Sequence, residues 1–178
     1  PDMSFLVQVS ILLSKILKKN DIIIFESTVY PGASKYLTKN YLEKGSGLKE
    51  NKDFFVGYSP ERINPGDRVH SIQNTKKILA IQTANKIIKK KIISIYKTIT
   101  KKIILSNKVE EAEMAKLIEN IQRDLEIAFI NDIYIFCRKM GYNFKNIIDL
   151  ASTKWNFKKF NAGLVGGHCL PVDPYYLV

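Results

Sequence analysis

The segment with the clearest chemical potential is residues 166–175, Gly-Gly-His-Cys-Leu-Pro-Val-Asp-Pro-Tyr. Its two glycines allow the backbone to approach a ligand closely, and Cys169 follows them in what we expect to be a loop. A cysteine is the best sulfur nucleophile near neutral pH once its surroundings lower the pKa of the thiol. One cysteine and the neighbouring His168 are too few ligands for a zinc site. The segment therefore favours Cys169 as a nucleophile, with Asp173 four residues further on.

The second cysteine, Cys137, lies inside an apolar run, Ile135-Phe-Cys-Arg, for which we predict a helix. There we expect it to be buried as a small apolar side chain. Two cysteines so far apart predict no disulfide framework, and they favour the reducing cytoplasm as the location of the protein.

A lysine and two amides with helical spacing form a second candidate set. Lys116 and Asn120 are four residues apart and share a helix face, and Asn131 follows about three turns later near the same face. These side chains could line a site and point at Cys169. An ordinary solvated polar face remains the alternative.

Two polar segments directly follow predicted strands. They are Glu26-Ser-Thr-Val-Tyr-Pro-Gly32 and Ser59-Pro-Glu-Arg-Ile-Asn-Pro-Gly-Asp67. Sites in parallel sheets gather at the carboxyl ends of strands, so we expect Thr28 and Glu61 at one edge, together with Cys169. The alternative is plain turn chemistry, because Ser, Pro, Asn, Gly and Asp favour turns for conformational reasons.

The elements that must position these residues follow from apolar periodicity. We predict strands at 21–25, 54–58, 77–81 and 102–105, and helices at 4–18, 33–42, 84–96, 109–140 and 144–150. Residues 44–51 and 152–178 are predicted as loops. Alternating strands and helices indicate an α/β fold with a parallel, Rossmann-like sheet. No Gly-x-Gly-x-x-Gly turn occurs, so we expect this sheet to be incomplete and to lack its N-terminal glycine-rich unit.

A long helix is expected at 109–140, where no glycine or proline interrupts the apolar spacing. Such a helix after an α/β unit often serves as a connector or as a dimer axis. We therefore divide the chain into residues 1–106, the α/β part, and residues 107–178, a helical connector that carries the cysteine loop.

The net charge of +11 comes from 28 Lys and Arg against 17 Asp and Glu. Only four of the basic residues are arginine, and lysines alternate with isoleucines. This favours solvated lysines on ordinary elements over a nucleic-acid-binding surface. No segment approaches the roughly 20 apolar residues of a membrane-spanning helix, and the first residues do not resemble a signal peptide.

Taken together, four segments resemble the UDP-glucose/GDP-mannose dehydrogenase family of nucleotide-sugar 6-dehydrogenases. They are Glu26-Ser-Thr-Val-Tyr-Pro-Gly, Phe55-Val-Gly-Tyr-Ser-Pro-Glu-Arg-Ile-Asn-Pro-Gly-Asp, Ala112-Glu-Met-Ala-Lys-Leu-Ile-Glu-Asn-Ile-Gln-Arg-Asp-Leu, and Lys154-Trp-Asn-Phe with Gly163-Leu-Val-Gly-Gly-His-Cys. The residues of these segments are most similar to those of the bacterial branch that acts on UDP-N-acetylhexosamines for surface polysaccharide synthesis. The resemblance covers nearly the whole chain, which corresponds to the middle of a family member. The glycine-rich part of the NAD-binding domain and the C-terminal nucleotide-binding domain are expected outside it.

The resemblance implies a reaction: the C6 alcohol of UDP-N-acetylglucosamine or UDP-N-acetylgalactosamine becomes a carboxylate, with two NAD as oxidants. Cys169 would form a thiohemiacetal and then a thioester, and Lys116 would stabilise oxyanion character at C6. Asn120 and Asp173 would hold water and assist proton transfer, and Thr28 and Glu61 would complete the water network.

The resemblance also implies contacts. Those to the cofactor would come from Thr28, Glu61 and Cys169. Those to the substrate would come from Glu61, Arg62, Ile63, Lys116, Asn120, Arg123, Phe160, Gly163, Gly166 and Gly167. The long helix would form a homodimer, and no metal, nucleic acid or membrane would take part.

Two alternatives remain open. The chain could be a non-catalytic segment that keeps only the dimer helix, because the glycine-rich unit lies outside it. It could also be a basic nucleic-acid-binding module, which only the net charge supports.

Overall fold

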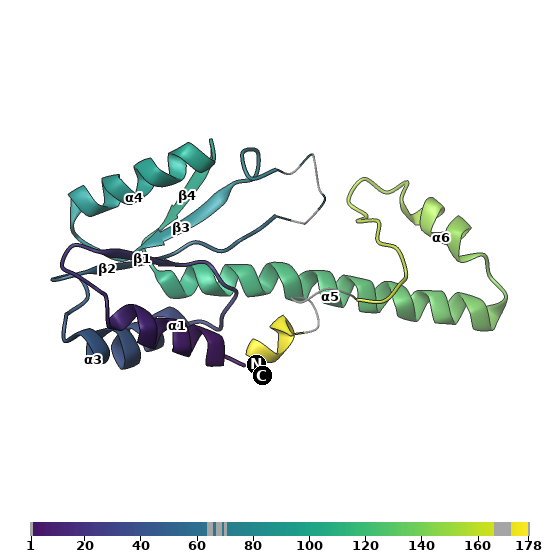
Figure 1. The fold of residues 1–178 in the computed structure, drawn as a ribbon. Helices are drawn as coiled ribbons and strands as arrows, with labels where there is room; N and C mark the ends of the chain where they lie inside the picture. The colour runs from purple at the N-terminus through teal and green to yellow at the C-terminus, as the bar shows by residue number, and fades with distance from the viewer. Residues whose placement is uncertain (1, 64–65, 67–68, 70, 166–171, 178) are drawn as a thin grey trace. The chain divides into compact units, whose positions relative to one another are not determined.

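A computed structural model of the chain describes residues 2–63, 66, 69, 71–165 and 172–177 (Figure 1). These residues fall into two compact units, one up to Leu117 together with Leu177, and one from Ile118 to Tyr176. Among the described residues, no helix combines the length and the apolarity that a membrane crossing requires.

The first unit is built on a four-stranded sheet. Its strands are β1 (Ile22–Phe25), β2 (Phe55–Tyr58), β3 (Lys77–Ile81) and β4 (Ile103–Ser106), which lie side by side in that order. The pairs β1–β2 and β3–β4 are parallel, whereas β2–β3 is antiparallel. The predicted α/β class with a Rossmann-like sheet is confirmed.

The prediction that the whole sheet is parallel is wrong at one pair of strands. Parallel neighbours need a crossover, usually a helix, whereas antiparallel neighbours can be joined directly. The described residues between Tyr58 and Lys77 form turns and irregular backbone and no helix. The chain therefore returns antiparallel at this point, while the two helical crossovers produce the two parallel pairs.

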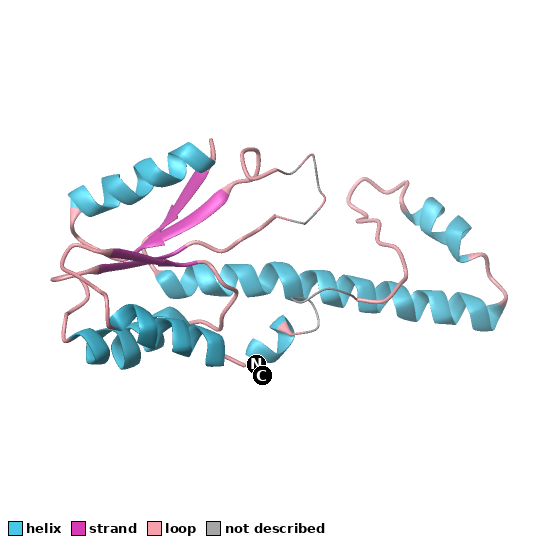
Figure 2. Ribbon diagram, in the orientation of Figure 1, coloured by secondary structure: helices cyan, strands magenta, loops and turns pink. Residues whose placement is uncertain are grey.

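Helices cover both faces of the sheet (Figure 2). One crossover consists of α2 (Ala33–Leu37), the π-helical turn η1 (Thr38–Leu42) and α3 (Glu43–Ser46), and the other is α4 (Lys86–Ile99). Side chains alternate along each strand, so each face has its own core. The core on the α4 face comprises Phe55, Leu79, Ile81, Ile88, Ile92 and Tyr96. The opposite core comprises Phe25, Val29, Ala33, Leu37, Leu42, Phe54, Val56, Tyr58, Ala80, Val109 and Ala112.

Helix α1 (Ser4–Ser14) ends earlier than the predicted Lys18. The hydroxyls of Ser10 and Ser14 donate to backbone carbonyls of the preceding turn, and Lys15 and Ile16 close the helix with bonds to the third residue back. Such side-chain competition weakens the helical ladder. Gly45 of α3 lies so close to Ser14 that a Cβ there would be 2.1 Å from the serine oxygen. This close approach requires glycine.

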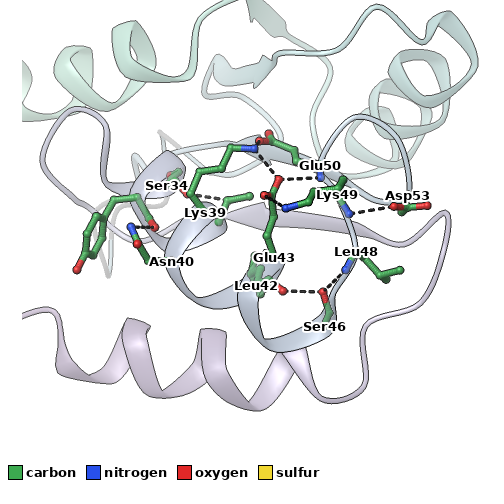
Figure 3. Close-up of polar contacts among 12 residues, drawn as sticks. Ser34, Lys39, Asn40, Leu42, Glu43, Ser46, Leu48, Lys49, Glu50 and Asp53 are labelled. Atoms are coloured by element: carbon green, nitrogen blue, oxygen red, sulfur yellow. Dashed lines mark hydrogen bonds and ion pairs between the residues drawn. The ribbon is translucent and has the colours of Figure 1, made fainter.

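Helix α3 begins one residue before the predicted loop at 44–51 and continues to Ser46. Its buried Glu43 accepts from Lys39 Nζ at 2.5 Å, from Lys49 Nζ at 3.2 Å and from the Glu50 amide at 3.0 Å (Figure 3). Burial raises the pKa of Glu43, but these donors outweigh it and leave the pKa at about 2. A carboxylate with three donors thus joins the end of the crossover to the segment that leads into β2.

The start of α2 is held by a side chain from α5 (Val109–Met140). Gly32, with φ of 93°, and Ser34 donate their amides to Glu113, which is fully buried, at 2.6 and 3.0 Å. A carboxylate at a helix N-terminus satisfies amides that have no partner within the helix. Glu113 therefore fixes the segment that follows β1.

The second unit contains most of α5, which has 32 residues and the predicted bounds. At 1.5 Å per residue the helix is about 48 Å long. Helix α6 (Phe144–Ala151) follows, and the Asn143 side chain caps it by accepting from the Asn146 amide. The short 3-10 helix η2 (Asp173–Tyr176) lies within the stretch predicted as loop.

Candidate active site

Thr28 and Glu61 follow neighbouring strands at the same edge of the sheet. Each lies three residues beyond the end of its strand, β1 or β2. Because β1 and β2 are parallel, their carboxyl ends meet at one edge, as predicted. Thr28 is half-buried and Glu61 is exposed. The first unit therefore presents both polar groups where a ligand can reach them.

Lys77 brings a buried positive charge to this edge. It begins β3, and because β3 is antiparallel to β2, its amino end lies beside the carboxyl end of β2. Its Nζ is 2.9 Å from Oε2 of Glu61 and 3.6 Å from Oε1 of Glu26. The hydroxyl of Tyr96, on α4, donates to the same Oε1 at 2.5 Å. We call Glu26, Glu61, Lys77 and Tyr96 the sheet-edge cluster.

The Glu61 carboxylate is held by donors on both oxygens. Oε1 accepts from the amides of Arg62 at 2.7 Å and Ile63 at 2.9 Å, while Oε2 accepts from Lys77. Burial raises the pKa of Glu61, but Lys77 and the two amides lower it by more than burial raises it. The pKa of Glu61 is therefore below its usual range. Glu61 is consequently a fixed, ionised acceptor near neutral pH.

Tyr96 of the sheet-edge cluster and the neighbouring Arg62 and Ile63 make different contacts. Burial and the Glu26 carboxylate raise the pKa of Tyr96, which therefore stays a protonated donor. The Arg62 guanidinium donates to the Lys76 carbonyl at 2.9 Å, and Ile63 is half-buried. The structure thus directs Arg62, predicted as a substrate contact, along the start of β3.

Helix α5 carries the predicted lysine and amides. Lys116 is half-buried, and Asn120, one turn later, is only 4% exposed. The Nδ2 of Asn120 donates to Oδ2 of Asp173, which is itself buried. The structure therefore brings together two predicted site residues that are 53 positions apart in the sequence.

A second amide on α5 holds the chain before the cysteine segment. Asn131 donates to the Gly163 carbonyl and accepts from the Gly163 amide, both at 2.8 Å. Phe160 is half-buried beside a pocket of about 280 Å³. This pocket is lined by Glu126, Phe129, Ile130, Asn156, Phe157, Lys158 and Phe160. Arg123, also predicted as a substrate contact, is exposed on α5.

Three predicted site residues, Gly166, Gly167 and Cys169, lie outside the described residues, as does His168. Cys137 is described, and its exposed fraction of 1% confirms that it is buried within α5. The described residues on either side of the cysteine segment are both bonded to α5: Gly163 before it and Asp173 after it.

The described residues fit only part of a dinucleotide. Carboxylates and a hydroxyl at the edge can accept from or donate to sugar hydroxyls. A pyrophosphate needs free amides at a helix N-terminus or in a glycine-rich turn. The amides at the start of α2 already bind Glu113, and the sequence contains no such turn. The Gly32 and Ser34 amides are therefore not free to bind the phosphates.

Sequence reasoning did not identify Glu26, Lys77, Tyr96 or Glu113 as parts of the site's framework. A signal existed for Lys77, which is a charged residue at the start of an otherwise apolar strand, Lys-Ile-Leu-Ala-Ile. It also existed for Glu26, which opens the first polar segment. Tyr96 and Glu113 could not be found in this way, because their partners lie 70 and about 80 positions away in the sequence.

Comparison with known proteins adds independent findings. The family model described as the UDP-glucose/GDP-mannose dehydrogenase family, NAD binding domain, matches residues 1–100. The model of the central domain of the same family matches residues 110–178.

Individual proteins agree with these matches. The chain is 49% identical to the UDP-N-acetyl-D-glucosamine 6-dehydrogenase of Pseudomonas aeruginosa, over 99% of this chain and 42% of that protein. It is 43% identical to the enzyme of the same name from Salmonella typhi, over 99% of this chain and 41% of that protein. The structure of UDP-D-ManNAc dehydrogenase from Pyrococcus horikoshii superposes with a TM-score of 0.89 and 33% identity, over 99% of this chain and 42% of that one. The chain thus spans about two fifths of the length of these relatives.

Proposed function

The chain belongs to the UDP-glucose/GDP-mannose dehydrogenase family, and we propose that it is the central part of an NAD-dependent UDP-N-acetylhexosamine 6-dehydrogenase. Residues 1–106 would complete the NAD-binding domain, and residues 107–178 would form the connector that carries the cysteine. The observation that carries this proposal is the bond from Asn120 to Asp173. It anchors the chain four residues after Cys169 to the helix that also carries Lys116.

The proposed reaction oxidises the sugar C6 twice. The C6 alcohol first becomes an aldehyde, and the Cys169 thiolate then attacks C6 to give a thiohemiacetal. Its oxidation gives a thioester, which water hydrolyses to the carboxylate with release of the thiolate. A covalent intermediate keeps the aldehyde in place until the second oxidation. The nicotinamide of NAD, when bound, accepts the hydride of each oxidation.

Charged residues of the chain would handle the oxygens of this reaction. Lys116 would stabilise negative charge on the C6 oxygen, since a cation beside a developing oxyanion lowers the barrier. Asn120 and Asp173 would hold the water and move its proton. Glu61, ionised and fixed by its donors, and Thr28 are proposed as the remaining groups of the water network.

Three further groups would bind the substrate and cofactor. The backbone from Gly163 to Gly167 would contact the sugar. Phe160, Arg123, Arg62 and Ile63 are proposed as further substrate contacts. Thr28, Glu61 and Cys169 would also face the cofactor. The relatives named as UDP-N-acetyl-D-glucosamine 6-dehydrogenases support a UDP-N-acetylhexosamine as the substrate. The proposal that the product serves surface polysaccharide synthesis rests on the resemblance of the sequence motifs alone.

A homodimer is proposed through α5. Five apolar side chains recur on α5 at intervals of seven and four residues, which places them on one face. Each is exposed by half or more: Ile118, Leu125, Phe129, Phe136 and Met140. A second copy of the chain offers the same stripe and would cover it.

The direct test of the function is the stoichiometry of the complete enzyme. We expect two NADH for each sugar acid formed from UDP-N-acetylglucosamine or UDP-N-acetylgalactosamine, measured by absorbance and by mass spectrometry of the product. One NADH with a released aldehyde, or no NADH with either sugar, would contradict the proposal.

A further inference from the structure

A buried lysine joins the two polar segments that follow β1 and β2. The Lys77 side chain is 6% exposed, whereas those of Glu26 and Glu61 are 48% and 45% exposed. Burying an ammonium is costly unless carboxylates and hydrogen bonds compensate for the lost water. The cation therefore lies beneath two carboxylates that themselves reach the surface of the sheet edge.

The contacts make Lys77 the structural centre of this edge. Its Nζ is 2.9 Å from Glu61 and 3.6 Å from Glu26, and Tyr96 donates to Glu26 at 2.5 Å. The Arg62 and Ile63 amides both donate to Oε1 of Glu61, whereas Lys77 donates to the other oxygen, Oε2. The lysine thus fixes the rotation of the Glu61 carboxylate, which the amides alone hold at only one oxygen.

We propose that Lys77 is a positioning residue of the active site, which fixes Glu61 in one orientation as an ionised acceptor and shares its charge with Glu26. The inference rests on the function proposed above. Lys77 acts through Glu61 and does not touch the reacting atoms. Because Glu26 competes for the same ammonium, the balance between the two carboxylates sets how strongly Glu61 attracts a proton.

The charged and titratable groups around Glu61 give opposite expectations for two substitutions. Lys77 lies on β3, Glu26 follows β1, Tyr96 lies on α4, and Arg62 is adjacent in the chain. Removing the ammonium in Lys77→Met should move the titration of Glu61 to higher pH by about one unit. Removing the competing charge in Glu26→Gln should move it to lower pH.

The titration can be measured without activity. Carboxyl carbon NMR of the 178-residue chain follows Glu61, whose signal is assigned by its loss in Glu61→Gln. Lys76→Met is the matched control, because it removes an exposed lysine at the neighbouring position and should leave the titration unchanged. If Lys77→Met does not fold, Glu26→Gln decides alone, since that side chain is half exposed. An unchanged Glu61 titration in Glu26→Gln and in any folded Lys77→Met overturns the proposal.

Kinetics of the complete enzyme separate positioning from mere structure. Lys77→Met should lower kcat about tenfold or more, change KM for the UDP-sugar by a smaller factor, and shift the acidic limb of the kcat profile to higher pH. Lys77→Arg should restore most of kcat, because a guanidinium can also donate to both carboxylates. A lower kcat with an unshifted pH profile would overturn the proposal. A wild-type enzyme inactive on every UDP-sugar would instead remove the proposed function, and the NMR titration would still decide whether Lys77 holds Glu61.

Discussion

At the scale of single residues, the chemistry depends on how side chains of one type are made different by their surroundings. Glu61 and Glu43 are both held ionised by lysines and amides, but Glu61 reaches the surface and Glu43 does not. The two cysteines are expected to differ as well. Cys137 is 1% exposed within α5, and the sequence places Cys169 among glycines.

The cysteines should therefore differ in reactivity. We expect brief treatment with iodoacetamide at neutral pH to label Cys169 at least about tenfold faster than Cys137, because an alkylating agent needs an accessible thiolate. Mass spectrometry of the two cysteine peptides measures this. In denaturant the two rates should become similar. Faster labelling of Cys137 in the folded chain would contradict the assignment of Cys169 as the nucleophile.

At the scale of elements, the sequence predicts the helices and strands whose apolar spacing is regular along their whole length. The bounds of α5 were predicted in full, because no glycine or proline interrupts its apolar spacing, and each strand was predicted within one residue. The direction of β3 was not predictable from apolar runs, which are alike in parallel and antiparallel buried strands. The end of α1 was missed, because it depends on serine hydroxyls and on the contact with Gly45.

The candidate site was also predictable only in part from the sequence. Motifs after strands placed Thr28 and Glu61 at one edge, since the carboxyl ends of parallel neighbours coincide. The partners that fix them, Lys77 and Tyr96, come from other elements and depend on the antiparallel pairing that the sequence did not reveal. Long-range bonds such as Asn120 to Asp173 became visible only in the structure, although both residues had been singled out.

The Glu43 contacts predict a dependence of stability on pH. The folded pKa of about 2 lies below the ordinary value of a glutamate, so its contribution to stability is present above about pH 4.5 and is lost as the pH falls towards 2. At pH 7, Glu43→Gln should lower the free energy of unfolding by about 1–3 kcal/mol, and the difference should shrink on acidification. Urea unfolding of the chain at several pH values measures it.

The control for this prediction is Glu111→Gln, which removes a carboxylate that is 63% exposed and paired with Lys108. Exposed pairs of this kind contribute little, so its effect should be small at every pH. Equal effects of the two substitutions would show that the buried contacts of Glu43 do not carry the stability assigned to them.

The bond between Asn120 and Asp173 predicts a local effect. Asn120→Ala should speed amide exchange in η2, for example at Tyr175, by about tenfold, because one buried hydrogen bond is lost. The matched control is Asn131→Ala, which should loosen the chain around Gly163 and leave η2 unchanged. Hydrogen exchange measured by mass spectrometry distinguishes the two. Unchanged exchange in η2 of Asn120→Ala would remove this anchor from the account.

At the scale of the whole molecule, the apolar stripe of α5 predicts assembly. Leu125→Glu should convert a dimer to a monomer, because a charge would be buried in the centre of the stripe. Ile135→Glu is the control, since Ile135 is also half exposed but lies on another face of α5. Light scattering after size-exclusion chromatography measures the mass. Dissociation by both substitutions, or by Ile135→Glu alone, would contradict the proposed interface.

The measurement that tests the central claim most directly is the activity of Cys169→Ala in the complete enzyme. The covalent mechanism predicts that this variant still binds NAD and the UDP-sugar. It should form the sugar acid far more slowly than the wild type, because no thiol is present to hold the aldehyde. Cys169→Ser should stop before the acid or accumulate an ester on the serine, visible as a mass increase of the peptide. Formation of the sugar acid at the normal rate by Cys169→Ala would contradict the account, however closely the rest of the chain matches its family.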